Sequence, residues 1–526
     1  ISDTIFLESL NIKPASIWYI LKYQRLVYHY DNILCQYLQK SSEGAEIILT
    51  ALDSDDKDKL YLPASLTENI RNDLIKKYIE SEKSNIISLH KITESHYIPP
   101  LPVDIKLIAK RKYEDFYNKY KGRYGYSSHI QLSFQENAIS PVSYSYENNI
   151  IENLYDLSWI KSNLDYPTLL NNFIYLFEFS DLKMRIDHTS KLTDLSIIEQ
   201  AMFDQLDKQQ YKIGATFKAK EMLAHTQINA YYKILENLGI RLENIISWFF
   251  SDYLINEFHA PHFRVTMPSA KTTYAEKCTL MLAAMESLIR QYRLYTKNGE
   301  IDFDLLQLDA TFVKYPNIPS ILSPKYAYGQ GDDYKAITYY LFSEQSLLTF
   351  IKRIPITYST LYDLLQKETV YLSDYDQRDI TRLNWLAEKH ILKFDKNQKI
   401  YFDNLNTIDI FYDLYRNEVI NINRYPIEVR EKIFQLADEN YLEFEDTLLS
   451  KPESALFNYY LNKAEFINGL DLRNGYMHGV KQTIVDEKHH EFNYFIILRL
   501  FIDLIIKIND EFCLKDLWQK QLEHKE

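Results

Sequence analysis

Glycine and cysteine are scarce in this sequence. Only 11 of the 526 residues are glycine, whereas 44 are tyrosine, a bias that fits an AT-rich coding genome. The three cysteines, Cys35, Cys278 and Cys513, lie far apart. This spacing excludes a Cys-x-x-Cys metal knuckle and a disulfide framework. A reduced, cytoplasmic protein is therefore expected.

Long hydrophobic runs are also lacking. The one candidate for a membrane span, Phe492 to Ile508, is interrupted by Arg499, Asp503 and Lys507, which recur every four residues. That spacing places the three charges on one helix face, where they would form ion pairs with one another. We expect a buried or interface helix and no membrane span. Residues 1–30 show no basic region followed by an apolar core and a cleavage site, so no export signal is expected.

The sequence also has no excess of basic residues. The 60 Lys and Arg are outnumbered by 73 Asp and Glu, which gives a net charge of −13. Non-specific binding to nucleic acid requires many Lys and Arg to neutralise phosphates. The sequence therefore argues against a surface that coats nucleic acid, and any RNA site must be a local patch. A hydrophobic content of 46% is ample for sizeable cores, and the length predicts several domains.

Hydrophobic periodicity predicts a mainly α, multidomain fold class. Turn signals and changes of pattern divide the chain into four regions. We expect a mixed α/β N-terminal region over 1–153, a helical middle domain over 154–327, a winged-helix-like segment over 334–404 and a C-terminal helical bundle over 405–526.

Short apolar runs in the N-terminal region predict strands at Glu46 to Leu52, Ile86 to Leu89 and Ile105 to Ile108. In the middle region, Thr273 and Glu276 have the spacing of a capping box and begin a long core helix. The last region is predicted to contain separate helices at Pro452 to Asn468, Glu491 to Asp510 and Leu514 to Glu523.

Two other local patterns are too weak to indicate chemistry. His259 and His262 are separated by a proline, which takes them off a common helix face, and no third metal ligand is apparent. Gly329 and Gly331 lack the preceding strand and the third glycine of a nucleotide-binding loop, so they predict a turn or linker. No metal and no cofactor is expected.

The winged-helix-like segment is predicted from the order helix, helix, hairpin. The helices span Thr360 to Lys367 and Asp376 to His390, and residues 392–402 alternate like a hairpin. Winged helices can place the second helix in the major groove of DNA. Here that helix mixes acidic and basic residues, which favours a protein-contacting or structural module. The charges are Asp374, Asp376, Asp379 and Glu388 beside Arg378 and Arg382.

One stretch of the chain, Lys106 to Tyr124, is both basic and aromatic. Interleaved cations and rings can bind phosphates while stacking bases. The alternative is the solvated face of an amphipathic helix. The candidate substrate-binding residues are Lys110, Arg111, Lys112, Lys119 and Arg123.

Arg473, Asn474 and His478 form the pattern with the clearest chemistry. They lie between the helices predicted at Pro452 to Asn468 and Glu491 to Asp510, so they sit at a junction where backbone amides are free. Flanking leucine and glycine complete the sequence Leu-Arg-Asn-Gly-Tyr-Met-His-Gly.

This pattern resembles the Arg-polar-x-x-x-His signature of the HEPN superfamily, small helical domains found in ribonuclease toxins, phage-defence proteins and CRISPR-associated nucleases. The resemblance is confined to the last predicted region. It implies a metal-independent endoribonuclease with catalytic Arg473, Asn474 and His478. It also implies a homodimer with a composite site, because members commonly pair two motifs and this chain has no second match. The implied setting is a toxin or abortive-infection effector in antiviral defence, restrained or triggered by a phage-derived or inhibitory partner.

The residue types suit that chemistry. Cleavage of RNA by its own 2′-hydroxyl requires a group that moves protons and a fixed positive charge for the phosphate. Histidine titrates near neutral pH and arginine is always charged. A histidine acid or base contributes about 10² to 10⁴ in rate, and a guanidinium stabilises phosphoryl oxygens. Asn474 would hold the histidine or the phosphate by a hydrogen bond.

Other interpretations stay open. In an interaction subunit that dimerises through its C-terminus, Arg473 would cap a helix or pair with Asp471 or Glu465, and His478 would be a buried structural residue. In a DNA-binding regulator, the winged-helix-like segment would present a positive face. The enzyme interpretation requires Arg473 and His478 to face each other across a cleft. His489 and His490 could also face that site, although their place at the start of a long helix is explained as well by solvent exposure.

Overall fold

The computed structural model confirms a mainly helical chain with small antiparallel sheets. Side chains are described except at 16, 116–120, 129, 146–147 and 521–523, where only the backbone is described. The structure describes residues 6–7, 10, 16–41, 43–52, 60–81, 84, 88–89, 92–93, 97–120, 129–147, 150–196, 199–200, 210–261, 263–308, 312–463, 465–479 and 486–523.

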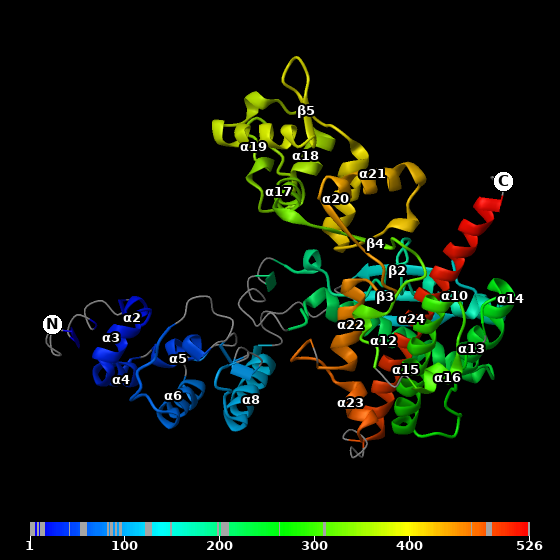
Figure 1. Ribbon diagram of the computed structural model, residues 1–526, viewed down its shortest axis with the longest axis horizontal. Coiled ribbons are helices and arrows are strands. Elements are labelled where there is room, and N and C mark those ends of the chain that lie inside the picture. The colour runs from blue at the N-terminus through cyan, green and yellow to red at the C-terminus, as the bar shows by residue number, and fades with distance from the viewer. Residues whose placement is uncertain are drawn as a thin grey trace. The chain divides into compact units, whose positions relative to one another are not determined.

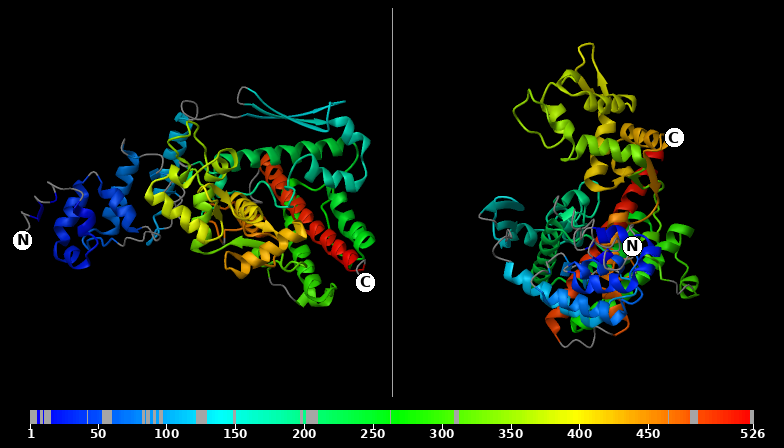
Figure 2. Two further views of the ribbon diagram at one scale, coloured as in Figure 1. Left: turned by 90° about the horizontal axis from the view of Figure 1, so that it is seen from above. Right: turned by 90° about the vertical axis from the view of Figure 1, so that its left-hand side faces the viewer.

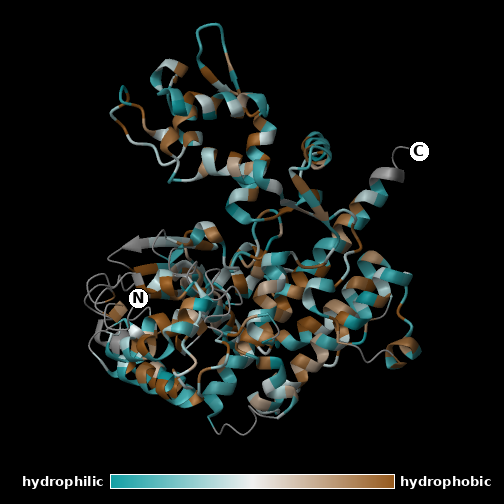
Figure 3. Ribbon diagram, turned by 60° about the vertical axis from the view of Figure 1, so that its left-hand side comes forward, coloured by the Kyte–Doolittle hydropathy of each residue, from teal (hydrophilic) through white to brown (hydrophobic). Residues whose placement is uncertain are grey.

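The chain divides into two compact units, each with its own core (Figures 1 and 2). Unit 1 comprises Ile1–His129 and Ile197–Gln210, and unit 2 comprises Ile130–Ser196 and Tyr211–Glu526. Hydrophobic and hydrophilic residues alternate along most helices of both units (Figure 3), as amphipathic helices require. No helix in the described part of the chain is long and apolar enough to cross a membrane.

Unit 1 is helical in its described residues, and two of its predicted strands are wrong. Glu46 to Leu52 lies in α5 and Ile105 to Ile108 lies in α8, because both runs bury one helical stripe, which a short apolar run cannot reveal. Of Ile86 to Leu89, residues 88–89 are helical and the rest lies outside the described residues. The helices are α2 (Ser16–Ile20), α3 (Gln24–His29), α4 (Asp31–Lys40), α5 (Gly44–Leu52), α6 (Glu68–Glu80) and α8 (Val103–Tyr120).

The larger core of unit 2 is a bundle built around one long helix, α24 (Glu487–Glu523). It packs lengthwise against α12 (Ala215–Asn237) and α15 (Tyr274–Asn298), which begins with the predicted capping box. A sheet of order β1-β3-β2 covers part of this core. Its strands are β1 (His129–Gln135), β2 (Val142–Glu147) and β3 (Ile150–Asp156).

The remaining helices of this bundle come from both ends of unit 2. Residues 448–512 share their core with residues 155–318, so the middle and C-terminal regions form one body. These helices are α9 (Leu157–Ser162), α10 (Tyr166–Tyr175), α13 (Leu242–Trp248), the π-turn η2 (Phe249–Tyr253), α14 (Leu254–Phe258), α16 (Phe303–Leu308), α22 (Lys451–Leu461) and α23 (Leu472–Met477).

Helix lengths near the C-terminus differ from the prediction. The predicted pair Glu491 to Asp510 and Leu514 to Glu523 is the single helix α24, whereas α22 ends at Leu461 instead of Asn468. Arg499, Asp503 and Lys507, which were expected to pair with one another along α24, each bond to another element. Arg499 bonds to Glu221 on α12, Asp503 to His188 and Lys507 to Glu453 on α22.

A second core of unit 2 spans 327–442 and contains the predicted winged-helix-like elements. It extends through 405–442, which the sequence-based division assigned to the C-terminal bundle. Of the turn or linker predicted at Gly329 and Gly331, the linker is wrong, since Gly329 ends a strand and Gly331 begins a helix, with only Gln330 between them. The elements are β4 (Tyr326–Gly329), α17 (Gly331–Phe342), α18 (Leu361–Lys367), η5 (Leu372–Asp374), α19 (Gln377–Glu388), β5 (Leu392–Phe394), β6 (Ile400–Phe402), α20 (Leu405–Asn417), β7 (Ile420–Asn421), η6 (Ile422–Arg424), α21 (Ile427–Asp438) and β8 (Leu442–Glu445).

Candidate functional site

The HEPN-like motif occupies the short helix α23 and the residue that ends it. Leu472 and Tyr476 bury one face of α23 against α15 and α22. Arg473 and Asn474 lie in the first turn, half-buried, and His478 is the exposed C-cap residue. The buried face fixes the helix, so the polar residues of the motif are presented from a rigid support.

Arg473 is held by three contacts. Its Nε donates to Glu286 Oε1 on α15, and its Nη1 donates to Asn474 Oδ1 at 2.9 Å. The guanidinium carbon lies 4.4 Å from the centre of the Phe312 ring. The Arg473 side chain keeps 21% of its surface exposed, so the group is oriented without being sealed from solvent.

Asn474 acts on the arginine and not on the histidine. Its Nδ2 donates to Asp471 Oδ1 at 2.8 Å while its Oδ1 accepts from Arg473. Asp471 adopts a left-handed backbone conformation at the start of α23. From the sequence we expected Asn474 to hold the histidine or the phosphate. In the structure its side chain instead accepts a hydrogen bond from the Arg473 guanidinium.

His478 and Arg473 are not in contact. Among the described residues, no side-chain hydrogen bond or ring contact involves His478, whose backbone N–H donates to Asn474 O at 3.1 Å. Neither interpretation of the motif is met in full. The enzyme interpretation required Arg473 and His478 to face each other, and the interaction-subunit interpretation required His478 to be buried, but Arg473 is bonded to Glu286 and His478 is exposed.

A buried polar network lies beside the motif. Tyr476 Oη and His490 Nδ1 are 2.8 Å apart, and Asn493 Nδ2 donates to Tyr476 Oη at 3.0 Å. Asn493 Nδ2 also lies 3.0 Å from His489 Nε2. Burial raises the pKa of Tyr476 well above its ordinary value. The sequence singled out the two histidines, but it gave no signal for Tyr476 or Asn493, whose partners lie across two helices.

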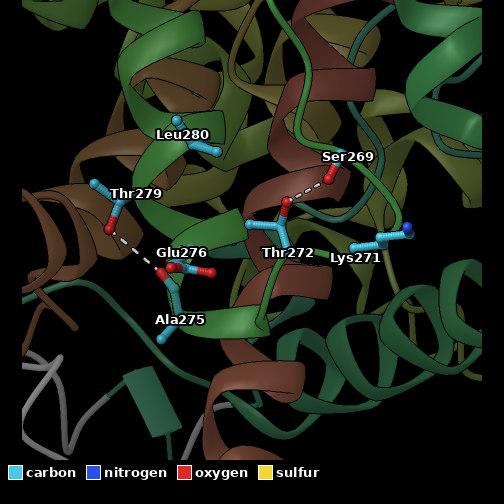
Figure 4. A pocket seen from close by; sticks show the side chains of 7 residues that line it. All are labelled: Ser269, Lys271, Thr272, Ala275, Glu276, Thr279 and Leu280. Atoms are coloured by element: carbon cyan, nitrogen blue, oxygen red, sulfur yellow. Dashed lines mark hydrogen bonds between the residues drawn. The ribbon is translucent and has the colours of Figure 1, made fainter.

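A cavity of about 660 Å³ opens at the start of α15 (Figure 4). Arg473, Asn474 and His478 do not line it. Ser269 and Thr272 bond to each other across its rim at 2.9 Å, and the Glu276 carboxylate is used by the capping box. Its lining residues are Ser269, Lys271, Thr272, Ala275, Glu276, Thr279 and Leu280.

The predicted substrate-binding residues of unit 1 lie on α8. Lys110 and Arg111 are exposed. Lys112 instead points at the end of α6, where its Nζ donates to the carbonyl oxygens of Ile79 and, at 2.8 Å, Ser81. The side chain of Lys119 and the whole of Arg123 lie outside the described residues.

Basic residues of the winged-helix-like segment are matched by carboxylates. Arg382 pairs with Asp379 at 2.8 Å, and Arg353 pairs with Asp374 at 2.8 Å. The Arg353 guanidinium lowers the pKa of Asp374. Lys389 donates to Asp333 at 2.5 Å. The positive face that the regulator interpretation requires is therefore neutralised at these positions.

The described residues contain no group of three or more His, Cys, Asp or Glu side chains arranged to hold a metal ion. His259 is described and His262 lies outside the described residues. No family model matches this chain, and comparison with curated proteins and with solved structures likewise gave no match.

Proposed function

We propose that this protein is a metal-independent endoribonuclease of HEPN type, acting as a toxin or abortive-infection effector in antiviral defence. The observation that carries the proposal is that one short helix bears an oriented arginine, Arg473, and ends at an exposed histidine, His478. Arg473 binds the phosphate, and His478 moves protons to or from the ribose and the leaving oxygen.

The geometry of Arg473 supports the first role. Nε and Nη1 are used by Glu286 and Asn474, whereas Nη2 has no hydrogen-bond partner in the described part of the chain. A guanidinium fixed on two sides offers its third nitrogen with little loss of side-chain entropy. Asn474 is a positioning residue in this proposal, since it touches Arg473 and Asp471.

The exposure of His478 supports the second role. An imidazole at a helix C-terminus, free of described side-chain partners, can exchange protons with solvent and substrate. One chain supplies one such pair, so we propose that a homodimer completes the site with the motif of a second copy. Lys110 and Arg111 on α8 supply further phosphate contacts, and the N-terminal unit receives a phage-derived trigger or an inhibitory partner.

The test is cleavage of total cellular RNA in EDTA by wild type, His478→Ala and Arg473→Ala. Matched controls are His390→Ala and Arg378→Ala, which remove exposed residues from the second core of unit 2. We expect both site variants to lose at least about 100-fold in rate, while the controls keep activity. Size-exclusion chromatography and thermal unfolding establish equal folding and dimer content. Absence of cleavage by wild type, also in extract of phage-infected cells, would overturn the proposal.

A second candidate function is a non-catalytic dimerising or sensor subunit of a defence complex. The Arg473 ion pair to Glu286 and its contact with Phe312 favour it, because they join α23 to α15 and to the segment before β4. In that case Arg473→Ala would lower the melting temperature, His478→Ala would leave it unchanged, and no variant would alter RNA turnover.

A further inference from the structure

The second core of unit 2 contains the same structural unit twice. Each repeat contains, in order, a helix, a short strand contact, a 3-10 turn, a second helix and a strand. The first repeat comprises residues 361–402 and the second comprises residues 411–445. The 3-10 turns η5 and η6 are 50 positions apart, and so are α19 and α21 at both ends. His390 and Asn440, which follow these helices at equivalent positions, both have positive φ.

The strand that completes each repeat comes from a different place in the chain. In the first repeat β6 pairs antiparallel with β5, and in the second β4 pairs antiparallel with β8. Three further contacts are equivalent. In the first repeat Tyr371 forms a β-bridge with Lys399, and in the second Asn421 pairs with Tyr326. Leu372 N donates to Gln398 O at 3.0 Å in the first repeat, and Ile422 N donates to Lys325 O at 2.9 Å in the second. Asp403 N donates to Ile391 O at 3.0 Å in the first repeat, and Gln330 N donates to Tyr441 O at 2.8 Å in the second.

The sequences of the two repeats align without a gap at this offset. Four of the nine identical pairs are buried in both repeats, so part of the common feature is the core. The identical pairs are Tyr362/Tyr412, Asp363/Asp413, Leu364/Leu414, Glu368/Glu418, Tyr375/Tyr425, Leu386/Leu436, Ala387/Ala437, Leu392/Leu442 and Phe394/Phe444.

The outward-facing stripe of the second helix differs in polarity between the two repeats. On α19 the exposed stripe reads Gln377, Thr381, Asn384 and Glu388, all polar. The equivalent stripe of α21 reads Ile427, Glu431, Phe434 and Asp438, in which apolar and acidic residues alternate. At these equivalent backbone positions the second repeat exposes the apolar Ile427 and Phe434 where the first repeat exposes the polar Gln377 and Asn384.

The apolar part of that stripe is extensive for a solvent-facing helix. Ile427 is 59% exposed, Phe434 41% and Phe444, on the adjacent strand β8, 37%. The rings of Phe434 and Phe444 meet at 5.4 Å, edge to face, so they form one patch. Exposed aromatic groups that cluster in this way are typical of interaction sites.

Carboxylates surround the patch. Glu428, Glu431 and Asp438 are exposed beside it on α21. The nearby cations are already engaged: Lys432 donates to Gln435 at 3.1 Å, and Lys451 pairs with Glu443 at 2.6 Å. Arg430, also on α21, donates to the Tyr425 carbonyl oxygen. Lys432 and Arg430 bond to neutral oxygens and keep their charge, but the carboxylates outnumber the cations, so the surface favours a basic partner over a nucleic acid.

We infer that the α21 stripe and Phe444 form a docking surface for a basic amphipathic segment of a partner protein. Apolar side chains of that segment cover Ile427, Phe434 and Phe444, and its Lys or Arg residues meet Glu428, Glu431 and Asp438. This is the complementarity of a helix laid on a helical face with matching charge. The inference does not depend on the proposed ribonuclease activity.

The test measures binding of a fluorescent helical peptide of leucine and lysine to the full-length protein by anisotropy. The comparison variant is Ile427→Gln with Phe434→Asn, which installs the residues of the first repeat. We expect it to bind the peptide at least about tenfold more weakly, as loss of apolar hot spots predicts. The matched control, Gln377→Ala with Asn384→Ala in the first repeat, should bind like wild type.

Three results of the binding experiment would overturn the inference. They are equal binding of a leucine and glutamate peptide, unchanged binding by the Ile427→Gln, Phe434→Asn variant, and competition by duplex DNA. A self-association that this variant abolishes would also overturn it, since a second copy of the chain would then be the occupant. Thermal unfolding of each variant verifies that the repeats remain folded.

Discussion

The guanidinium of Arg473 and the carboxylate of Glu286 form an ion pair that joins α23 to α15. The two side chains are each about one-fifth exposed, at 21% and 20%. An ion pair at such a position orients the arginine and also cancels its charge. If Arg473 binds phosphate as proposed, Glu286 sets how strongly it does so.

Glu286→Gln should strengthen RNA binding at Arg473. The amide can still accept the hydrogen bond from Nε, but it no longer neutralises the guanidinium. A partly exposed pair is worth up to about 1 kcal/mol, so affinity should rise up to about fivefold. Fluorescence titration with single-stranded RNA measures this. The same substitution in an Arg473→Ala background should have no effect, and a gain in that background would refute the explanation.

The sequence placed Arg473, Asn474 and His478 in a junction between two helices, whereas the structure places the first two in a short helix of their own, α23, which was not predicted, with His478 at its C-cap. The side chains that these residues contact could not be predicted from the sequence. Glu286 lies 187 positions earlier in the chain, and the packing of α15 on α23 alone brings it to Arg473. Local spacing can predict which face a residue occupies, but not which distant carboxylate meets it.

The charged stripe of α24 likewise shows that spacing predicts the face of a helix but not the partners of its residues. Spacing of four residues correctly placed Arg499, Asp503 and Lys507 on one face. Partners within the helix were expected, because residues four apart on a helix lie close enough to form ion pairs. The stripe is buried, and each charge is instead matched by a neighbouring element.

The repeat could have been predicted. An ungapped comparison of the chain with itself would have aligned Tyr362-Asp363-Leu364 with Tyr412-Asp413-Leu414. That alignment would have assigned residues 405–442 to the second core of unit 2. The role of β4 could not have been found in this way, because it is supplied from outside the second repeat.

Lys507→Met should strongly destabilise the protein. Lys507 and Glu453 are fully buried and 2.8 Å apart, and although burial raises the pKa of a carboxyl, the ammonium holds that of Glu453 below its ordinary value. Removing one partner leaves a buried charge, at a cost of about 3 to 5 kcal/mol. Urea unfolding measures it. Adding Glu453→Gln should restore part of the loss, and a double variant as unstable as the sum of the singles would contradict the pairing.

His225 should make stability depend on pH. Burial, with the nearby Arg499, lowers the pKa of His225 from 6.5 to about 4. Its ring packs 4.2 Å from Phe492. The unfolded chain therefore binds a proton at a higher pH than the folded chain. This contribution is fully present above pH 6.5 and is lost as the pH falls to about 4.

The expected loss over that range is on the order of 1 to 3 kcal/mol. His225→Phe keeps the ring contact and removes the titration. The difference in unfolding free energy between wild type and variant should therefore grow as the pH falls from 6.5 to 4. A difference that is constant across this range would show that His225 does not titrate differently in the two states.

The basic residues of α8 should separate into binding and structural groups. Lys110 and Arg111 are exposed, so replacing both with alanine should weaken RNA binding and reduce the salt slope of log K by about 1 to 2. Lys112 caps the carbonyls at the end of α6. Lys112→Ala should therefore cost about 1 to 2 kcal/mol of stability and leave the salt slope nearly unchanged. RNA titrations at several salt concentrations, beside thermal unfolding, distinguish the groups. If Lys112→Ala alone lowers the salt slope, phosphate binding belongs to the capping lysine and the helix end it touches.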